Sequence, residues 1–183
     1  MNGISFGKAK LSDALRISVL LKTVYIQTYA VEGVTFEFAN FITKRFSLEN
    51  IENLIQNNPS RLIIAYQNGN PVGVAEILYD STCPIRNIAV PELSKLYVLE
   101  RFYGKGVGFR LMNEAEKEVL KNGFKEFNLE VYINNVRAIA FYQRQGYTSI
   151  GKVDFPMESN TYENLVMNKL LSLESVLKNS GRS

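Results

Sequence analysis

The chain has 183 residues, 46% hydrophobic and 21% charged, which is typical of one soluble globular domain. Its 21 basic and 18 acidic residues leave a net charge of +3, too small to indicate a nucleic-acid or membrane partner. With no histidine and only Cys83 as a cysteine, Ser-His-Asp catalysis, Cys-His catalysis and an internal disulfide are excluded, and a zinc site is disfavoured.

The sequence also lacks the marks of a membrane or secreted protein. No apolar run approaches the roughly 20 residues that span a bilayer. The N-terminal residues do not have the layout of a secretory signal peptide. We therefore expect a cytoplasmic protein with no bound metal.

Two helices are expected in the first sixty residues. Ser12 or Asp13 is a suitable N-cap for a helix that ends near Tyr29. Ser47 is a suitable N-cap for a second helical segment. The aromatic-rich residues 31–46 between them fit no element clearly.

The middle of the chain has the pattern of a β-hairpin and a further strand. Asn68-Gly69 is a strong turn signal between two apolar runs. The expected strands are residues 61–67, 72–79 and 88–98, with residues 80–87 as a loop.

The second half alternates helices and strands. A helix is expected from about Gly104 to Asn122-Gly123, a common C-terminal signal. The later elements are a strand at residues 129–132, a short helix after Asn135, and strands at residues 147–153 and 162–170. The pattern predicts a mixed α+β domain over residues 1–171 with a sheet flanked by helices, and a short tail at residues 172–183.

Glycines at alternate positions separate the strand at residues 88–98 from the following helix. Gly104, Gly106 and Gly108 let the backbone turn tightly with exposed N–H groups. At a helix N-terminus such groups bind anions, phosphate above all. Arg101 and Lys105 add positive charge. We therefore expect residues 101–109, the glycine turn, to bind a pyrophosphate.

Two common phosphate loops do not match. A P-loop needs G-x-x-x-x-G-K followed by Ser or Thr, and a dinucleotide fingerprint would need glycine where Phe109 stands. What remains is Arg-x-x-Gly-x-Gly, formed by Arg101, Gly104 and Gly106. This motif resembles that of the GNAT superfamily of N-acetyltransferases, which hold the pyrophosphate of acetyl-coenzyme A (acetyl-CoA) in such a turn.

A second block strengthens this resemblance. The block is Asn135-x-x-Ala138-x-x-Phe141-Tyr142-x-x-x-Gly146-Tyr147. It resembles the family signature N-x-x-A-x-x-F-Y-x-x-x-G-F/Y, and one helix and one strand separate it from the first motif. The similarity covers about residues 61–170. It implies the GNAT fold, with a mostly antiparallel central sheet in a single domain, and acetyl-CoA as co-substrate.

The resemblance also implies roles for individual residues. Strand backbone would bind the pantetheine arm, the glycine turn would bind the pyrophosphate, and Asn135, also a suitable N-cap, would lie near the arm. Tyr142 would be the general acid, because a tyrosine with a pKa near about 10 keeps its proton at neutral pH. The expected cofactor-binding residues are Leu96, Tyr97, Val98, Arg101, Gly104, Lys105, Gly106, Val107, Gly108, Phe109, Asn135 and Tyr142.

The general base is left open. An alkyl amine with a pKa near about 10.4 is almost fully protonated at neutral pH, so the enzyme must deprotonate or desolvate it. Glu92, on the strand before the glycine turn, is the leading candidate. Glu130, Glu76 and a chain of water molecules are the alternatives.

The acceptor is expected to be a small primary amine. Overall similarity is greatest to bacterial acetyltransferases of polyamines and similar amines. The side chains of Tyr25, Tyr29, Glu32, Phe36, Glu37 and Phe38 form either an aromatic, acidic pocket for a cation or ordinary core. Protein or peptide acetylation and a non-catalytic acyl-CoA sensor are the alternatives, and a homodimer is left open.

Overall fold

The computed structural model describes residues 3–30, 33–57, 61–156 and 161–172. The chain forms two compact units, Met1–Glu76 with Lys95–Glu114, and Ile77–Ser94 with Ala115–Ser183. We call them unit 1 and unit 2 and describe each by itself.

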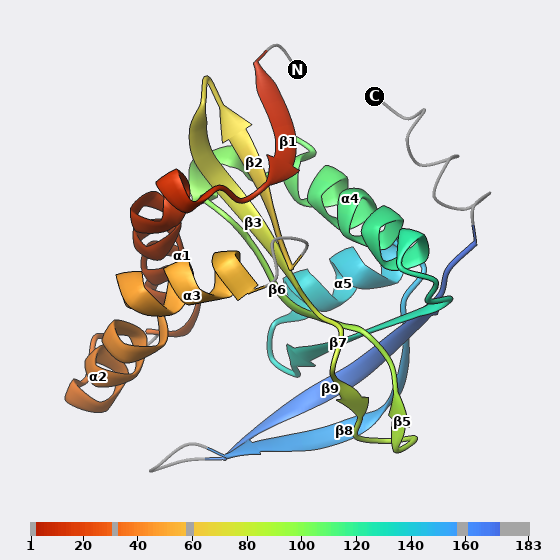
Figure 1. The fold of residues 1–183 in the computed structure, drawn as a ribbon. Coiled ribbons are helices and arrows are strands. Elements are labelled where there is room, and N and C mark those ends of the chain that lie inside the picture. Colours follow the sequence, from red (N-terminus) through yellow and green to blue (C-terminus); the bar gives the residue numbers. More distant parts are fainter. Residues whose placement is uncertain (1–2, 31–32, 58–60, 157–160, 173–183) are drawn as a thin grey trace. The chain divides into compact units, whose positions relative to one another are not determined.

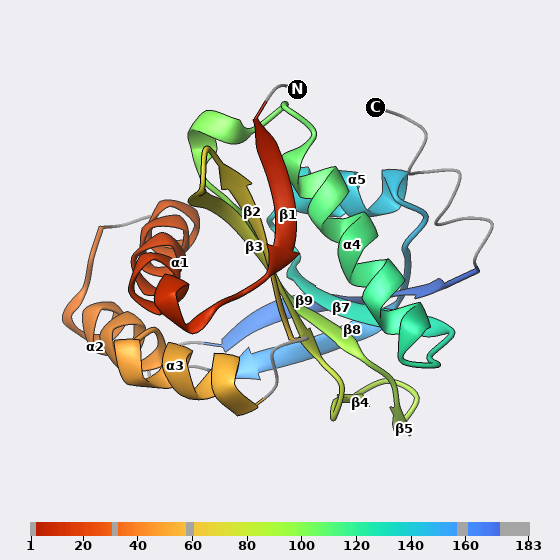
Figure 2. The same cartoon turned by 45° about the horizontal axis from the view of Figure 1, so that its top comes forward.

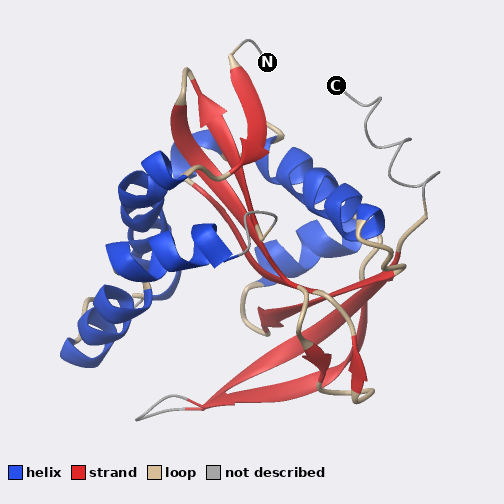
Figure 3. Cartoon of the chain, in the orientation of Figure 1, coloured by secondary structure: helices blue, strands red, loops and turns tan. Residues whose placement is uncertain are grey.

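The elements follow one another along the chain as a mixture of helices and strands (Figures 1 and 3). They are β1 (Ile4–Lys8), α1 (Ala14–Tyr29), α2 (Phe36–Arg45), α3 (Leu48–Asn57), β2 (Leu62–Gln67), β3 (Asn70–Leu78), β4 (Thr82–Cys83), β5 (Ile88–Ala89), β6 (Glu92–Val98), α4 (Val107–Lys121), β7 (Glu126–Tyr132), α5 (Val136–Arg144), β8 (Thr148–Pro156) and β9 (Thr161–Leu170).

Unit 1 is built on strands in the order β1-β2-β3-β6, with β1, β2 and β3 antiparallel. The turn between β2 and β3 has Asn68 and Gly69 at φ 51° and 77°. Both residues are therefore in the left-handed region that an Asn-Gly hairpin requires, and the predicted hairpin is confirmed.

Helices α1, α2 and α3 lie together on one side of β2 and β3 (Figures 1 and 2). Alternate strand residues, Leu62, Ile64 and Val74, are buried in the core shared with these helices. The opposite side of β3 approaches α4, since a Cβ placed on Gly73 would lie 3.0 Å from Leu111 Cδ1. The two faces of the hairpin thus pack against different helices, as the period of two along a strand dictates.

Unit 2 contains strands in the order β6-β7-β9-β8. The β7–β9 and β8–β9 pairs are antiparallel, and the latter forms a long ribbon (Figure 3). Only the β6–β7 pair is parallel among these, through Glu92 with Asn128 and Leu93 with Leu129. The described pairings are therefore mostly antiparallel, as expected.

Helix caps explain several boundaries. The Ser47 hydroxyl accepts a hydrogen bond from the Asn50 N–H at 3.2 Å, which confirms the predicted cap of α3. The predicted end of α4 is also confirmed, with Gly123 at φ 88° immediately after Asn122. A helix end of this kind favours glycine because a Cβ disfavours positive φ.

Other predictions were wrong in detail. Residues 31–46, whose sequence fits no element clearly, contain α2, capped by Thr35. The predicted loop at residues 80–87 contains β4, which pairs with β5. Helix α4 begins at Val107 rather than near Gly104, because the two preceding glycines have positive φ. Residues 173–183 of the predicted tail lie outside the described residues.

No helix within the described ranges is both long and apolar enough to cross a membrane.

We predict that Gly73→Ala destabilises the protein by about 1–3 kcal/mol, because overpacking displaces neighbours. The new Cβ would lie 3.0 Å from both Leu111 Cδ1 and the Tyr97 carbonyl oxygen. Urea unfolding measures the effect. Gly7→Ala on β1 is the matched control, since its Cβ would meet no heavy atom within 4 Å. Equal stability of the two variants would contradict the close packing at Gly73.

Candidate active site

The glycine turn lies in unit 1, between β6 and α4. Gly104 and Gly106 each have φ 72°, a conformation that side chains disfavour. The first backbone bond of α4 runs from the Arg110 N–H to the Gly106 carbonyl, at 3.0 Å. The N–H groups of residues 107–109 therefore lie at the helix N-terminus, where the dipole favours an anion.

The two expected cations are also part of this segment. Arg101 is exposed on a short 3₁₀ helix of one turn, Glu100–Phe102. The Lys105 ammonium lies 5.2 Å from the centre of the Phe102 ring, within the range of a cation–π contact. Both side chains can add positive charge to an anion held by the turn.

The end of β6 is fixed through the side chain of Tyr97. This ring packs against the α1–α3 core and lies 6.3 Å from the ring of Tyr25. Burial raises the pKa of Tyr29, while a hydrogen bond with Tyr97 opposes that rise. Residues 96–98 therefore lie on a strand whose position the aromatic core helps to define.

Half of the aromatic residues considered for a cation pocket belong to the core. Tyr25 lies 4.5 Å from Tyr29 and 5.6 Å from Phe38, between ring centres. Phe36 is different, since 84% of it is exposed. Glu32 lies outside the described residues. The alternative interpretation as core packing thus holds for Tyr25 and Phe38, two of the four aromatic residues, since Tyr29 is 39% exposed.

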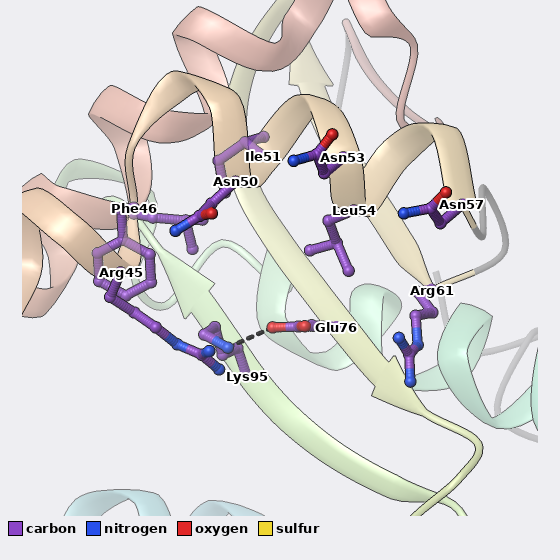
Figure 4. A pocket seen from close by; sticks show the side chains of 11 residues that line it. Arg45, Phe46, Asn50, Ile51, Asn53, Leu54, Asn57, Arg61, Glu76 and Lys95 are labelled. Atoms are coloured by element: carbon purple, nitrogen blue, oxygen red, sulfur yellow. Dashed lines mark hydrogen bonds and ion pairs between the residues drawn. The ribbon is translucent and has the colours of Figure 1, made fainter.

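A pocket of about 300 Å³ opens in unit 1 between α3 and the strands β3 and β6 (Figure 4). Glu76 and Lys95 form an ion pair at its strand side, and both side chains are buried. Leu54 lines it from α3, and Arg45 and Arg61 add two more cations. The pocket therefore contains one carboxylate and three cationic side chains.

Unit 2 holds Asn135 and Tyr142, both on or beside α5. The Asn135 side chain accepts a hydrogen bond from the Ala138 N–H at 3.2 Å, so the predicted N-cap is confirmed. Tyr142 is half-buried in the last two turns of the helix, with its ring centre 5.4 Å from that of Phe141 and 6.0 Å from that of Tyr147.

The three candidate carboxylates have different surroundings. Glu92 is half-buried and accepts a hydrogen bond from the Ser81 hydroxyl at 2.7 Å. Glu130 accepts one from the Asn164 side chain at 3.4 Å. Glu76 is paired with Lys95 in unit 1. Glu92 and Glu130 thus each accept a hydrogen bond from a neutral donor, whereas Glu76 is paired with a cation.

Sequence reasoning missed the partners of these groups. Ser81 lies within the loop predicted at residues 80–87, and Lys95 lies within the strand predicted at residues 88–98. Lys169 and Glu116 form a further buried ion pair, at 2.6 Å, in unit 2. The available sequence signal was the spacing of four between Met112 and Glu116, which places the two residues on one face of α4. Both side chains are fully buried in the structure.

The family is established by comparison with known proteins. A model described as "Acetyltransferase (GNAT) family" matches residues 26–147, which is more than half of the chain. The matched segment includes residues of both units, as expected for a single domain. The chain therefore belongs to the GNAT family of acetyltransferases. It is an acetyl-CoA-dependent N-acetyltransferase.

Individual relatives agree with this result. An uncharacterised N-acetyltransferase of Methanocaldococcus jannaschii is 26% identical, over 76% of this chain and 70% of its own. A spermidine N(1)-acetyltransferase of Thermoplasma acidophilum is 28% identical, over 79% of this chain and 88% of its own. The solved structure of PaiA N-acetyltransferase from Thermoplasma acidophilum in complex with coenzyme A matches with a TM-score of 0.70 at 22% identity. The match covers 92% of this chain and 99% of that chain. This likeness confirms the predicted fold.

We predict that Asn135→Ala lowers the free energy of unfolding by about 1 kcal/mol, because α5 loses its side-chain cap. Asn135→Ser keeps a capping oxygen and should restore most of that stability. Thermal unfolding of the two variants measures the difference. A rise in the KM for acetyl-CoA in both variants would indicate a role beyond the cap, whereas a rise in neither would contradict a cofactor contact.

Proposed function

We propose that this enzyme transfers the acetyl group from acetyl-CoA to the primary amine of a small molecule by direct attack in a ternary complex. The amine nitrogen attacks the thioester carbonyl, the carbon–sulfur bond breaks, and the amine loses a proton. The observation that carries this proposal is the glycine turn, in which two positive-φ glycines directly precede the N-terminus of α4. That backbone suits the pyrophosphate of acetyl-CoA.

The remaining roles follow the family pattern. The backbone of Leu96, Tyr97 and Val98 would bind the pantetheine arm in the manner of a neighbouring strand. Tyr142 would donate its proton to the departing thiolate. Glu92 would accept the proton of the amine, directly or through water, and its hydrogen bond from Ser81 would orient the carboxylate.

A polyamine is the first candidate acceptor. It is supported by the 28% identical relative, which is a spermidine N(1)-acetyltransferase. A polyamine carries several ammonium groups, so its acetylation would require carboxylates or aromatic faces around the acceptor.

The pocket beside α3 favours a second class, acceptors that carry a carboxylate. Its three cations, Arg45, Arg61 and Lys95, outnumber the single carboxylate of Glu76. Lys95 also lies on β6 two residues before Tyr97, on the same face of the strand. An amino acid or an acidic peptide could place its carboxylate there, as guanidinium groups bind carboxylates in two-point contacts.

The experiment that tests the proposal measures thiol release from acetyl-CoA with spermidine, free amino acids and short acidic peptides. Turnover with spermidine alone would support the polyamine, and turnover with the carboxylate-bearing amines alone would support the second class. Coenzyme A binding with no turnover on any acceptor would contradict the transfer reaction and favour a sensor of acyl-CoA.

We predict that Tyr142→Phe lowers kcat by about 100-fold with little change in acetyl-CoA affinity, because general acid catalysis typically contributes about 10²–10⁴-fold. Phenylalanine keeps the ring contact with Phe141 and removes only the hydroxyl. Steady-state kinetics and acetyl-CoA titration measure the two effects. Wild-type kcat in this variant would exclude Tyr142 as the acid.

We also predict that Gly106→Val raises the KM for acetyl-CoA at least ten-fold. A β-branched residue disfavours the φ of 72° that Gly106 adopts, and its side chain would crowd the amides at the start of α4. Gly33→Val is the matched control, because Gly33 has φ 101° outside the turn and no heavy atom within 4 Å of its Cβ position. Unchanged acetyl-CoA binding in Gly106→Val would refute the assignment of the turn.

A further inference from the structure

The C-terminus of α5 forms a specific capping motif that includes Tyr142. The Tyr147 N–H donates to the Tyr142 carbonyl at 3.1 Å, and the Gly146 N–H donates to the Gln143 carbonyl at 3.0 Å. Gly146 has φ 88°. These two bonds around a left-handed glycine define a Schellman motif. In it Tyr142 is the third residue from the helix end, and Tyr147 is the second residue beyond the cap.

A Schellman motif usually brings together the side chains at these two positions. Here they are two tyrosines, whose ring centres lie 6.0 Å apart with the planes at 61°. This edge-to-face geometry is one that aromatic pairs prefer. Tyr142 is therefore held to Tyr147 by a backbone hydrogen bond and by a ring contact.

The hydroxyl end of the Tyr147 side chain is fixed as well. It is 1% exposed, and its hydroxyl donates to the carboxylate of Glu116 on α4, itself 0% exposed. The Lys169 ammonium of β9 binds both Glu116 oxygens, at 2.6 and 2.8 Å, and lies 5.5 Å from the centre of the Tyr147 ring. One buried cation thus contacts both the carboxylate and the ring.

The charges of this cluster fit its buried position. Burial, and after it the carboxylate of Glu116, raises the pKa of Tyr147 well above its usual value, so the hydroxyl keeps its proton as a donor. Burial also raises the pKa of Glu116, while Lys169 opposes that rise. Each polar group of the cluster has a hydrogen-bonding partner within unit 2, as buried polar groups require.

We propose that Tyr147, Glu116 and Lys169 position Tyr142 for proton transfer. The inference rests on the proposed role of Tyr142 as the general acid. The Tyr147 hydroxyl holds the ring against which Tyr142 packs, and Lys169 and Glu116 fix that hydroxyl to β9 and α4. Tyr147, Glu116 and Lys169 are thus positioning residues, which act through Tyr142 and do not take part in the reaction.

The end of α4 shows that the hydroxyl is not needed for the cap itself. That helix ends in the same two bonds, from Gly123 to Leu120 and from Phe124 to Val119. Phe124 occupies the position of Tyr147 and has no hydroxyl. Removal of the hydroxyl at position 147 should therefore leave the Schellman motif formed, but without its attachment to Glu116 the motif should open more often.

The test is a double-mutant cycle of Tyr147→Phe and Tyr142→Phe in the full chain, assayed with acetyl-CoA and spermidine. We expect Tyr147→Phe alone to lower kcat about ten-fold with the KM for acetyl-CoA within two-fold, since small misplacements of a catalytic group are costly. In the Tyr142→Phe background, the same change should have no further effect on kcat. An equal loss in both backgrounds, or no loss in either, would overturn the proposal.

Tyr79→Phe is the matched control. It removes another tyrosine hydroxyl of unit 2, which accepts a hydrogen bond from Asn122 at 3.2 Å, and should leave kcat unchanged. The combined variant Glu116→Met with Lys169→Met replaces the ion pair by apolar side chains of similar length, so the Tyr147 hydroxyl loses its acceptor. It should lower kcat as Tyr147→Phe does. Wild-type kcat in the combined variant would remove Glu116 and Lys169 from the proposal.

Amide hydrogen exchange separates this proposal from the proposed function and needs no acceptor. Loss of the hydroxyl should speed exchange at the amides of Gly146 and Tyr147 several-fold, because their bonds hold the end of α5. Unchanged exchange would overturn the anchoring, whatever the chemistry. Faster exchange together with wild-type kcat in Tyr142→Phe would instead show that the anchor exists and that the proposed acid is wrong.

Discussion

A buried lysine requires an anionic partner, and each unit of this enzyme contains one such pair among its described residues. Transfer of an ion from water to the interior costs several kcal/mol, and only a close partner with further hydrogen bonds offsets that cost. In unit 1 Lys95 of β6 pairs with Glu76 of β3. In unit 2 Lys169 of β9 pairs with Glu116 of α4. Any packing of the two elements that separated the paired charges would therefore be less stable.

Local signals in the sequence predicted the elements that local chemistry determines. Asn68-Gly69 indicated the hairpin, and Ser47 and Asn135 indicated helix starts, because each acts within about four residues. Thr35 gave the same kind of signal for α2 but was obscured by the aromatic residues around it. Strand β1 has five residues with a glycine inside and depends on pairing with β2, so its own sequence predicts little.

In the candidate site, too, the sequence predicted only the features that local chemistry determines. The alternation of glycines correctly indicated a strand-to-helix turn with positive φ at Gly104 and Gly106. Gly108 instead lies within the first turn of α4 and does not have a positive φ. The partners of Glu76 and Glu116 are 19 and 53 residues away along the chain. No motif spacing encodes such distances, and only the fold reveals them.

The contrast between the two helix ends connects stability with chemistry. Helices α4 and α5 finish in the same backbone motif, which any glycine followed by an apolar residue can form. Only at α5 does the residue after the glycine carry a hydroxyl, and only there does a buried carboxylate accept it. A phenylalanine would cap the helix but would leave Glu116 with one donor fewer in the interior. The tyrosine therefore satisfies the buried carboxylate and, through the same ring, fixes the end of the helix that carries Tyr142.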